Sequence, residues 1–492
     1  MQQLDFSWIP RKPWSQVLSH KLDYYQFFQQ FKRTAKSCYL FESLEMPRHQ
    51  DRYYSMGFNP AATFTGKGRT LQIEGEANYL QQLLGNTVGG HYCLDDVNPY
   101  QVLRDSVGQG FASFATGHQG GLIGYFCYET INCIEPCLAL EEHQDFSLFK
   151  QGLYLDGLLF DSTTYELTYY SYEADSIRSQ KLAQCQLFVA DLEAKQAACP
   201  LEPIKIGLDS VEFKGFTETK AQFINAVEST RRKIADGFSF QAEVGFKSLY
   251  GIKGDKFAIY NRLRQINPSP YMFYLRFDNA DRPLELLGSS PEILLSQSDS
   301  VLLTTPAAGT THRGKTPQED ADLGRALLSD QKEIAEHNML VDLHRNDIAK
   351  VSIAGSVKVS DLMYLIKFSH VQHIASNVIG LKKPELNGFD TLASVFPGGV
   401  VTGAPKIETM KIIDENEHLP RGPYGGAVGR MSLNGDATFC LAIRSLFCAG
   451  DDCFVQTSAG IVYDSEPEKE FQETCNKLAA MKQVLEELGD EA

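Results

Sequence analysis

Predicted strands and helices occur in separate blocks along these 492 residues rather than in strict alternation. Apolar runs between turn residues, such as 120–126 and 152–160, predict strands in the N-terminal part. A helix is expected over 176–195 and another over 217–236. Strands are expected over 238–250 and 271–277. This order favours an α+β fold, with large antiparallel sheets packed as a double layer and helices outside.

The starts of two further helices are marked by their sequences. Thr316-Pro317-Gln318-Glu319 is a capping box with proline at the first helical position. Ser465-Glu466-Pro467-Glu468 has the same form near the C-terminus. After this second box, apolar residues recur at steps of three and four from Phe471 to Leu488, which predicts one buried helix face.

Prolines interrupt the pattern twice within the segment 198–203. We therefore predict a boundary at 205/206, between an N-terminal region (1–205) and a catalytic region (206–492). The length suits two domains or one unusually large double layer.

Composition argues against two classes of protein. The formal net charge is −16, and the absence of any Lys/Arg-rich run argues against nucleic acid as a partner. No window approaches the roughly 20 consecutive apolar residues of a membrane span. The segment 1–13 is mixed and polar, so we expect a cytoplasmic protein.

Two pairs of glutamates are candidate metal ligands. Glu333 and Glu336 are three residues apart in a predicted helix, and Glu470 and Glu473 have the same spacing in another. Residues at this spacing project from one helix face. Each pair alone is typical of a solvated face. Two pairs, each beside an apolar stripe, could instead share Mg²⁺, which prefers carboxylate oxygens.

Arg444 and His373 are candidate site residues with two interpretations each. Arg444 lies in the strand-like apolar run 439–447, where its guanidinium requires an anionic partner, either a protein carboxylate or a substrate carboxylate. His373 lies in the half-apolar segment 369–376 and is either structural or catalytic.

Ten short segments, in their order along the chain, strongly resemble the motifs of the chorismate-utilising enzymes. This family includes the large subunit of anthranilate synthase, aminodeoxychorismate synthase, isochorismate synthase and salicylate synthase. The matching segments lie within 215–485 and are Gly288–Glu292, Pro306–Thr310, Glu333–His337, Val341–Asp347, Val371–His373, Thr402–Lys406, Arg421–Gly429, Ala442–Arg444, Ala459–Val462 and Glu470–Glu473.

The resemblance implies a substrate site for chorismate. Glu336 and Glu473 would bind Mg²⁺ directly, supported by Glu333 and Glu470, and the metal would hold the ring carboxylate. Tyr424 and Arg444 would clamp the enolpyruvyl carboxylate. Further substrate contacts are implied for Gly309, Thr310, Ser458, Ala459 and Gly460.

The resemblance also implies catalytic roles. Glu292 would protonate the departing C4 hydroxyl, which requires a raised pKa of the kind that burial gives. His373 would assist the second half-reaction, in which a ring proton and enolpyruvate leave. Thr402, in the motif Thr402–Lys406, is a further catalytic candidate.

Two positions distinguish members of the family. Gln241 stands where water-using members carry a lysine, and a neutral glutamine cannot act as a general base. Ala308 stands where many aminodeoxychorismate synthases carry a lysine. Gln241 therefore favours ammonia over water as the nucleophile, and Ala308 favours anthranilate as the product, which would make this the first reaction towards tryptophan. The segment 243–247 and Arg430 depart from the usual pattern. The alternatives are therefore aminodeoxychorismate synthase component I, aminodeoxyisochorismate synthase, or a binding protein that has lost turnover.

Two partners are expected besides chorismate. None of the eleven cysteines lies in a Gly-x-Cys-x-Gly context, so ammonia would come from a separate glutamine amidotransferase subunit docked over the Mg²⁺ site. The segment 40–43, ending at Ser43, resembles the Leu-Leu-Glu-Ser motif with which anthranilate synthases bind L-tryptophan. Pro270, Tyr271 and Met272 resemble its second wall. The alternative is that Ser43 caps a turn and Met272 belongs to the core.

Overall fold

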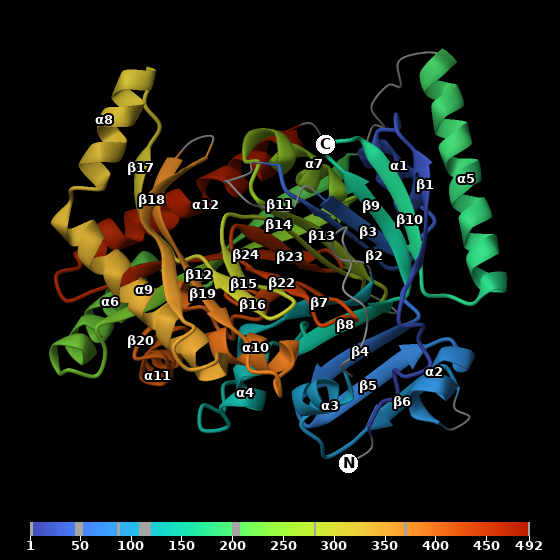
Figure 1. The fold of residues 1–492 in the computed structure, drawn as a ribbon. Helices are drawn as coiled ribbons and strands as arrows, with labels where there is room; N and C mark the ends of the chain where they lie inside the picture. The colour runs from blue at the N-terminus through green and yellow to red at the C-terminus, as the bar shows by residue number, and fades with distance from the viewer. Residues whose placement is uncertain are drawn as a thin grey trace.

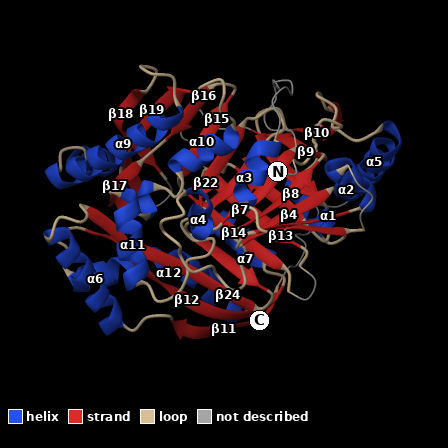
Figure 2. Ribbon diagram, turned by 90° about the horizontal axis from the view of Figure 1, so that it is seen from below, coloured by secondary structure: helices blue, strands red, loops and turns tan. Residues whose placement is uncertain are grey.

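The structure is a computed structural model that describes residues 3–44, 53–85, 89–107, 120–198, 207–279, 282–368 and 371–490. Two antiparallel sheets, each of 12 strands, pack face to face with helices around them (Figure 1). Seen from below, strands fill the centre and most helices lie at its edge (Figure 2). This confirms the predicted α+β double layer. No helix in these ranges is long and apolar enough to cross a membrane.

Sheet A contains, in spatial order, β1 (Trp14–Ser19), β10 (Glu166–Ser171), β9 (Asp156–Asp161), β3 (Tyr53–Phe58), β2 (Cys38–Glu42), β13 (Tyr271–Phe277), β14 (Leu284–Ser290), β23 (Ser445–Ala449), β24 (Asp452–Ile461), β12 (Gln241–Gly254) and β11 (Leu208–Phe216), with β20 (Gly403–Ala404) beside β12.

Sheet B contains β17 (Ala307–His312), β19 (Val371–Leu381), β16 (Val301–Thr304), β15 (Ile293–Ser298), β22 (Ala437–Leu441), β21 (Ala427–Met431), β7 (Gly121–Phe126), β8 (Phe149–Tyr154), β4 (Ala62–Lys67), β5 (Thr70–Gly75) and β6 (His91–Leu94), with β18 (Lys358–Lys367) beside β19.

The helices are α1 (Tyr24–Lys32), α2 (Ala77–Leu84), α3 (Pro99–Ser106), α4 (Ile131–Ile134), α5 (Asp175–Ala198), α6 (Lys220–Ala235), α7 (Phe257–Ile266), α8 (Pro317–Leu327), α9 (Gln331–Val351), α10 (Gly388–Val395), α11 (Lys406–Asn416) and α12 (Pro467–Asp490). In Figure 1, α5 lies at one side of the molecule and α8 and α9 lie at the other.

Side chains alternate between two cores along the strands of sheet A. On β13, Phe273 and Leu275 pack between the two sheets, together with Tyr125 of sheet B. Met272 and Tyr274 of the same strand pack on the opposite face, in the core beneath the helices. This two-residue period follows from strand geometry, and it makes both faces of the sheet apolar.

The predicted boundary at 205/206 lies outside the described residues. Strands from the two sides of that boundary nevertheless pair in both sheets. In sheet A, β2 pairs with β13, with Glu42 opposite Met272. In sheet B, β7 pairs with β21, with Gly124 opposite Gly429. The two predicted regions therefore contribute to the same sheets.

Local sequence signals located several elements correctly. Thr316 caps α8, with its Oγ1 accepting from the Glu319 amide at 3.2 Å. Helix α12 begins at Pro467 as expected, although Ser465 Oγ accepts from the Val462 amide. The predicted single strand over 152–160 is wrong, because the chain passes from sheet B to sheet A at Leu155.

Candidate active site

Two chain segments cross from one sheet to the other side by side. One carries Glu292, between β14 and β15, and the other carries Arg444, between β22 and β23. The Ser289 amide donates to Arg444 O at 3.3 Å, and the Leu441 amide donates to Glu292 O at 3.1 Å. These bonds hold the acid and the guanidinium at one place in the fold.

The prediction that 439–447 forms one strand is therefore wrong. Arg444 has a φ of 51°, a left-handed backbone conformation that interrupts strand geometry between the two sheets. Apart from Arg444 and Ser445 the run is apolar, because its two ends are buried strands of the two sheets. Hydrophobicity alone thus gave no sign of the crossing.

A cavity of about 1020 Å³ opens beside these two crossings. Its lining includes many of the predicted catalytic and substrate-binding residues, namely Glu292, Thr310, His373, Tyr424, Arg444 and Ser458, together with Ala308. Apolar side chains such as Ile366, Phe368 and Val400 also line it. An apolar cavity with a few convergent polar groups is typical of a small-molecule site.

The Glu292 carboxyl is suited to donating a proton. Burial raises its pKa to about 8; the Arg444 charge opposes this shift, and the Glu243 charge adds to it. Its Oε1 is buried without a hydrogen-bond partner among the described residues. Glu292 is therefore protonated at neutral pH and has a polar atom available for a ligand.

His373 lies at the same cavity as a neutral base. Its Nδ1 lies 2.9 Å from Thr310 Oγ1 and 3.2 Å from Gly309 O, which fixes the ring. Its Nε2 is buried without a partner among the described residues. Burial, with a smaller contribution from the Arg444 charge, lowers the His373 pKa to about 4. The free ring nitrogen can accept a proton from a ligand.

Arg444 and Tyr424 provide donors to the cavity. Burial lowers the pKa of Arg444, while Glu292 raises it. Tyr424 Oη lies 2.8 Å from Ser458 Oγ, which in turn donates to Glu243 Oε2 at 2.6 Å. A guanidinium and a phenol at one cavity can together bind a carboxylate.

The four predicted metal ligands lie on α9 and α12, near this cavity. A β-carbon at Gly309, whose φ is 75°, would lie 2.8 Å from Glu333 Oε2, so that carboxylate reaches β17, the strand that holds His373. Burial raises the Glu333 pKa, and the charges of Glu336 and Glu473 add to the shift. Acidic side chains from both helices therefore gather near one another.

Lysines neutralise two of these glutamates. Lys332 lies 3.6 Å from Glu336, and Lys477 lies 2.9 Å from Glu473. Within the described part of the chain, no three Asp, Glu, His or Cys side chains are grouped so as to hold a metal ion as they stand. The donor set itself consists of carboxylate oxygens from two helices, which is chemistry that suits Mg²⁺.

Other predicted residues lie beside the cavity rather than in its lining. Thr402 is fully buried, and its hydroxyl donates to Gly398 O at 3.0 Å, which orders its own loop. Gln241 lies against Gly460, where a β-carbon would approach its Nε2 to 2.5 Å. Ala459 is fully buried and lies opposite Val244 in the sheet.

Two charged residues that the sequence prediction missed also line the cavity. They are Glu243 on β12 and Lys477 on α12. Burial raises the pKa of Glu243, and the Lys477 charge opposes this. The available signal was a single charge within the otherwise apolar run 242–246. Such a charge is unusual in a buried strand and requires a partner.

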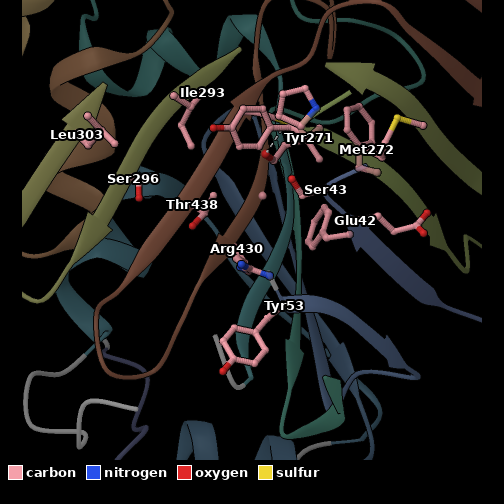
Figure 3. Close-up of a pocket in the computed structure, with 16 residues that line it drawn as sticks. Glu42, Ser43, Tyr53, Tyr271, Met272, Ile293, Ser296, Leu303, Arg430 and Thr438 are labelled. Atoms are coloured by element: carbon pink, nitrogen blue, oxygen red, sulfur yellow. Dashed lines mark hydrogen bonds between the residues drawn. The ribbon is translucent and has the colours of Figure 1, made fainter. Parts of the chain in front are cut away.

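A second cavity, of about 740 Å³, brings together the predicted tryptophan contacts Ser43, Pro270, Tyr271 and Met272 (Figure 3). Ser43 Oγ is buried without a hydrogen-bond partner in the described ranges. This hydroxyl could therefore bond to a ligand in the second cavity. The Met272 side chain also packs in the core beneath the helices.

The neighbouring Glu42 anchors this part of β2. Its side chain points away from the cavity in Figure 3. Its carboxylate accepts from Tyr24, from Tyr260 at 2.5 Å and from Arg264 at 2.9 Å. These bonds fix the strand end that carries Ser43.

Comparison with known proteins gives consistent matches. Residues 22–483 match the family model described as chorismate binding enzyme. Anthranilate synthase component 1 of Leptospira biflexa is 38% identical over 482 residues, which cover 97% of each chain. Aminodeoxychorismate synthase component 1 of Bacillus subtilis is 34% identical over 483 residues, also 97% of each.

Among solved structures, anthranilate synthase component I from Streptococcus pneumoniae is similar, with a TM-score of 0.74 and 30% identity. The match covers 89% of this chain and 94% of that one.

Proposed function

The chain belongs to the chorismate binding enzyme family, and from this we propose that it aminates chorismate with ammonia and eliminates pyruvate to give anthranilate. The observation that most supports this proposal is the meeting of Glu292, His373 and Arg444 at one cavity. An acid, a neutral base and an anion-binding group are the parts that the two half-reactions require.

Chorismate carries two carboxylates, and the cavity offers a partner for each. We assign the enolpyruvyl carboxylate to Arg444 and Tyr424, whose donors face the cavity. Glu336 and Glu473, supported by Glu333 and Glu470, would hold Mg²⁺. Its positive charge would offset the negative charge of the ring carboxylate. Gly309, beside Glu333, connects this end of the cavity to His373.

In the first half-reaction, ammonia bonds to the ring as the C4 hydroxyl departs. Hydroxide is a poor leaving group, so the hydroxyl must receive a proton as the C–O bond breaks. Glu292 holds that proton at neutral pH because burial has raised its pKa. It donates the proton, and the hydroxyl leaves as water.

In the second half-reaction, the ring loses a proton and the enolpyruvyl group departs as enolpyruvate, which gains a proton at its methylene carbon to become pyruvate. His373 Nε2 is the acceptor for the ring proton, since Nδ1 is engaged with Gly309 and Thr310. The lowered pKa keeps this imidazole neutral before the transfer. Formation of the aromatic ring drives the elimination.

Gln241 supports ammonia as the nucleophile, and Ala308 supports anthranilate as the product. Ala308 lines the cavity without an amine that could attack chorismate. Gln241 offers no general base for water. The similarity to aminodeoxychorismate synthase component 1 of Bacillus subtilis makes 4-amino-4-deoxychorismate the alternative product.

We further propose two partners. Ammonia would come from a separate glutamine amidotransferase subunit that docks near the mouth formed by α9 and α12. L-tryptophan would bind in the second cavity, with the free Ser43 hydroxyl meeting its amino-acid group and the surrounding apolar residues meeting the indole.

The test uses the purified chain with chorismate, Mg²⁺ and either an ammonium salt or glutamine. We expect blue-fluorescent anthranilate and pyruvate with ammonium and neither with glutamine. Addition of a glutamine amidotransferase subunit should make glutamine effective. Synthesis from glutamine by the single chain would contradict the proposed partner, and absence of any aminated product from ammonium would contradict the proposed function.

A further inference from the structure

Arg421 is a buried guanidinium that the mechanism above does not use. It is 2% exposed and is not among the described residues that line the chorismate cavity. Its Nε donates to Glu417 Oε2 at 2.8 Å, and its Nη2 donates to Glu417 Oε1 at 2.7 Å. This pair neutralises the buried charge, which would be costly if it were left alone. It uses one edge of the guanidinium and leaves donors for other groups.

The other donors of Arg421 reach two segments of the cavity wall. Nη1 donates to Val401 O at 2.6 Å, and Nη2 also donates to Glu243 O at 2.7 Å. Val401 and Glu243 both line the chorismate cavity. Val401 lies in the short 3₁₀ turn Gly399–Val401, and Glu243 lies on β12. The guanidinium therefore joins the turn to the strand from behind the wall.

The turn and the strand are also joined by their backbones. The Glu243 amide donates to Thr402 O at 2.9 Å, and the Thr402 amide donates to Gly399 O at 3.2 Å. Together with the two bonds from Arg421, these bonds close a ring of contacts between turn and strand. Loss of the guanidinium would take the donor away from the buried Val401 carbonyl. An unmet buried acceptor is costly, so the turn would change its position.

Tyr424 is the third residue of the cavity wall that lies against Arg421. The guanidinium carbon is 5.6 Å from the centre of the Tyr424 ring and 4.6 Å from the centre of the Tyr128 ring. A guanidinium is attracted to the face of an aromatic ring. Burial raises the pKa of Tyr424 to about 12, and the Arg421 charge opposes this shift. Arg421 therefore affects both the place of this ring and the strength of its hydroxyl as a donor.

The backbone on both sides of Arg421 is fixed. On one side, Lys247 Nζ donates to Pro420 O. On the other side, the Gly422 amide donates to Glu129 Oε1 at 3.0 Å. These contacts determine where the Arg421 side chain starts. A planar guanidinium on a fixed backbone can hold its partners in one geometry.

We propose that Arg421 is a positioning residue for the chorismate cavity. It holds Val401, Glu243 and Tyr424 in the arrangement that binds the substrate. The inference rests on the proposed function, in which Tyr424 binds the enolpyruvyl carboxylate. Arg421 does not touch the substrate and neither gives nor takes a proton. It keeps the wall in its binding shape, so that little of the binding free energy is spent on ordering the wall.

The first test measures chorismate binding without turnover. Calorimetric titration with chorismate and Mg²⁺, in the absence of a nitrogen source, gives the Kd. Arg421→Lys keeps a cation for Glu417, but a lysine has no planar fork with which to bind Glu417 and the two carbonyls together. We expect the Kd to rise about tenfold or more. An unchanged Kd in Arg421→Lys would overturn the positioning role.

Lys32→Met is the control for a general loss of stability. Lys32 is buried, pairs with Asp255 at 2.8 Å and lies over the rings of Phe257 and Tyr274, outside both cavities. Loss of this buried cation should lower the melting temperature and leave the Kd for chorismate unchanged. A Kd that rises equally in Lys32→Met and Arg421→Lys would show that affinity only follows stability, and it too would overturn the positioning role.

The second test is a double-variant cycle with Tyr424→Phe. If Arg421 acts through the Tyr424 hydroxyl, removal of the hydroxyl removes part of its effect. The Kd of the double variant should then be smaller, by about threefold or more, than the product of the two single effects predicts. Single effects that simply multiply would overturn the action through Tyr424.

The third test needs no ligand. Amide hydrogen exchange, followed by mass spectrometry, should be faster in segment 399–404 of Arg421→Lys than in the wild type or in Lys32→Met. Faster exchange, combined with a wild type that binds no chorismate, would refute the proposed function and leave the hold of Arg421 on the turn standing. Chorismate binding by the wild type, combined with equal exchange in all three proteins, would refute the positioning role alone.

Discussion

Tyr271 and Ile293 stand in the wall between the two cavities, and each lines both of them. Ile293 also follows Glu292 directly in the chain. A ligand in the cavity that contains Ser43 therefore contacts the same side chains as a ligand beside the proposed general acid. This shared wall gives a physical route by which occupancy of one cavity alters the other.

The first prediction concerns inhibition by tryptophan. If tryptophan and chorismate favour different arrangements of the wall, each lowers the affinity of the other by the same factor. Ser43→Phe should fill the second cavity and leave an active enzyme that tryptophan no longer inhibits. Ser43→Ala, which removes only the hydroxyl, should weaken inhibition about two- to tenfold. Inhibition curves with tryptophan measure the effect in both variants. Unchanged inhibition in Ser43→Phe would contradict the proposed tryptophan site.

The second prediction concerns pH. Glu292 acts in its protonated form, and its pKa is raised to about 8. Activity that depends on it is therefore present below that value and falls as pH rises through it. The profile of kcat/KM for chorismate, measured at saturating ammonium, should show this fall. His373, with a pKa of about 4, stays neutral over the same range.

Glu292→Gln serves as the matched variant for that profile. It keeps the shape of the side chain but has no acidic proton, so the rate should drop by about 10²- to 10⁴-fold at every pH. A wild-type profile that stays flat from pH 7 to well above 8, or a fully active Glu292→Gln enzyme, would exclude Glu292 as the acid.

The third prediction concerns the metal. Glu336→Gln and Glu473→Gln should each abolish turnover, as should EDTA, and added Mg²⁺ should restore the EDTA-treated wild type. The side chains are 31% and 53% exposed, so losing either charge should change the melting temperature little. Glu468→Gln on the same helix, whose carboxylate pairs with Lys220, is the control and should remain active. Full activity in EDTA would rule out the magnesium assignment.

The fourth prediction concerns the nucleophile. Wild-type protein should make no isochorismate, because Gln241 cannot activate water. Gln241→Lys should lose amination and begin to form isochorismate, since the lysine amine would provide a base for water. Chromatography of the products distinguishes these outcomes. Isochorismate as the main product of the wild type would overturn the amination mechanism.

Local signals in the sequence located elements well where a few neighbouring residues determine them. Strand β13 has the predicted limits, and Thr316 forms the predicted cap. The pairing of β2 with β13 joins residues more than 200 positions apart, and no local pattern specifies such a partner. That pairing is what brings Ser43 to Met272, so only the resemblance to a family anticipated their meeting.

The site was predictable to the extent that its residues lie in recognisable motifs. Glu292, His373 and Arg444 were identified in this way, and the structure brings all three to one cavity. The crossing at Arg444 was missed because the chain on both sides of it lies in buried strands and is apolar. Glu243 was missed as a site residue because only the fold brings β12 and α12 together, which places Glu243 and Lys477 at the same cavity.

The most direct measurement is the identity of the product formed from chorismate, Mg²⁺ and ¹⁵N-ammonium by the purified chain, determined by mass spectrometry. Amination followed by elimination predicts ¹⁵N-labelled anthranilate and one equivalent of pyruvate. A labelled product that retains the enolpyruvyl group, 4-amino-4-deoxychorismate above all, or a product without the label, would contradict the proposed reaction.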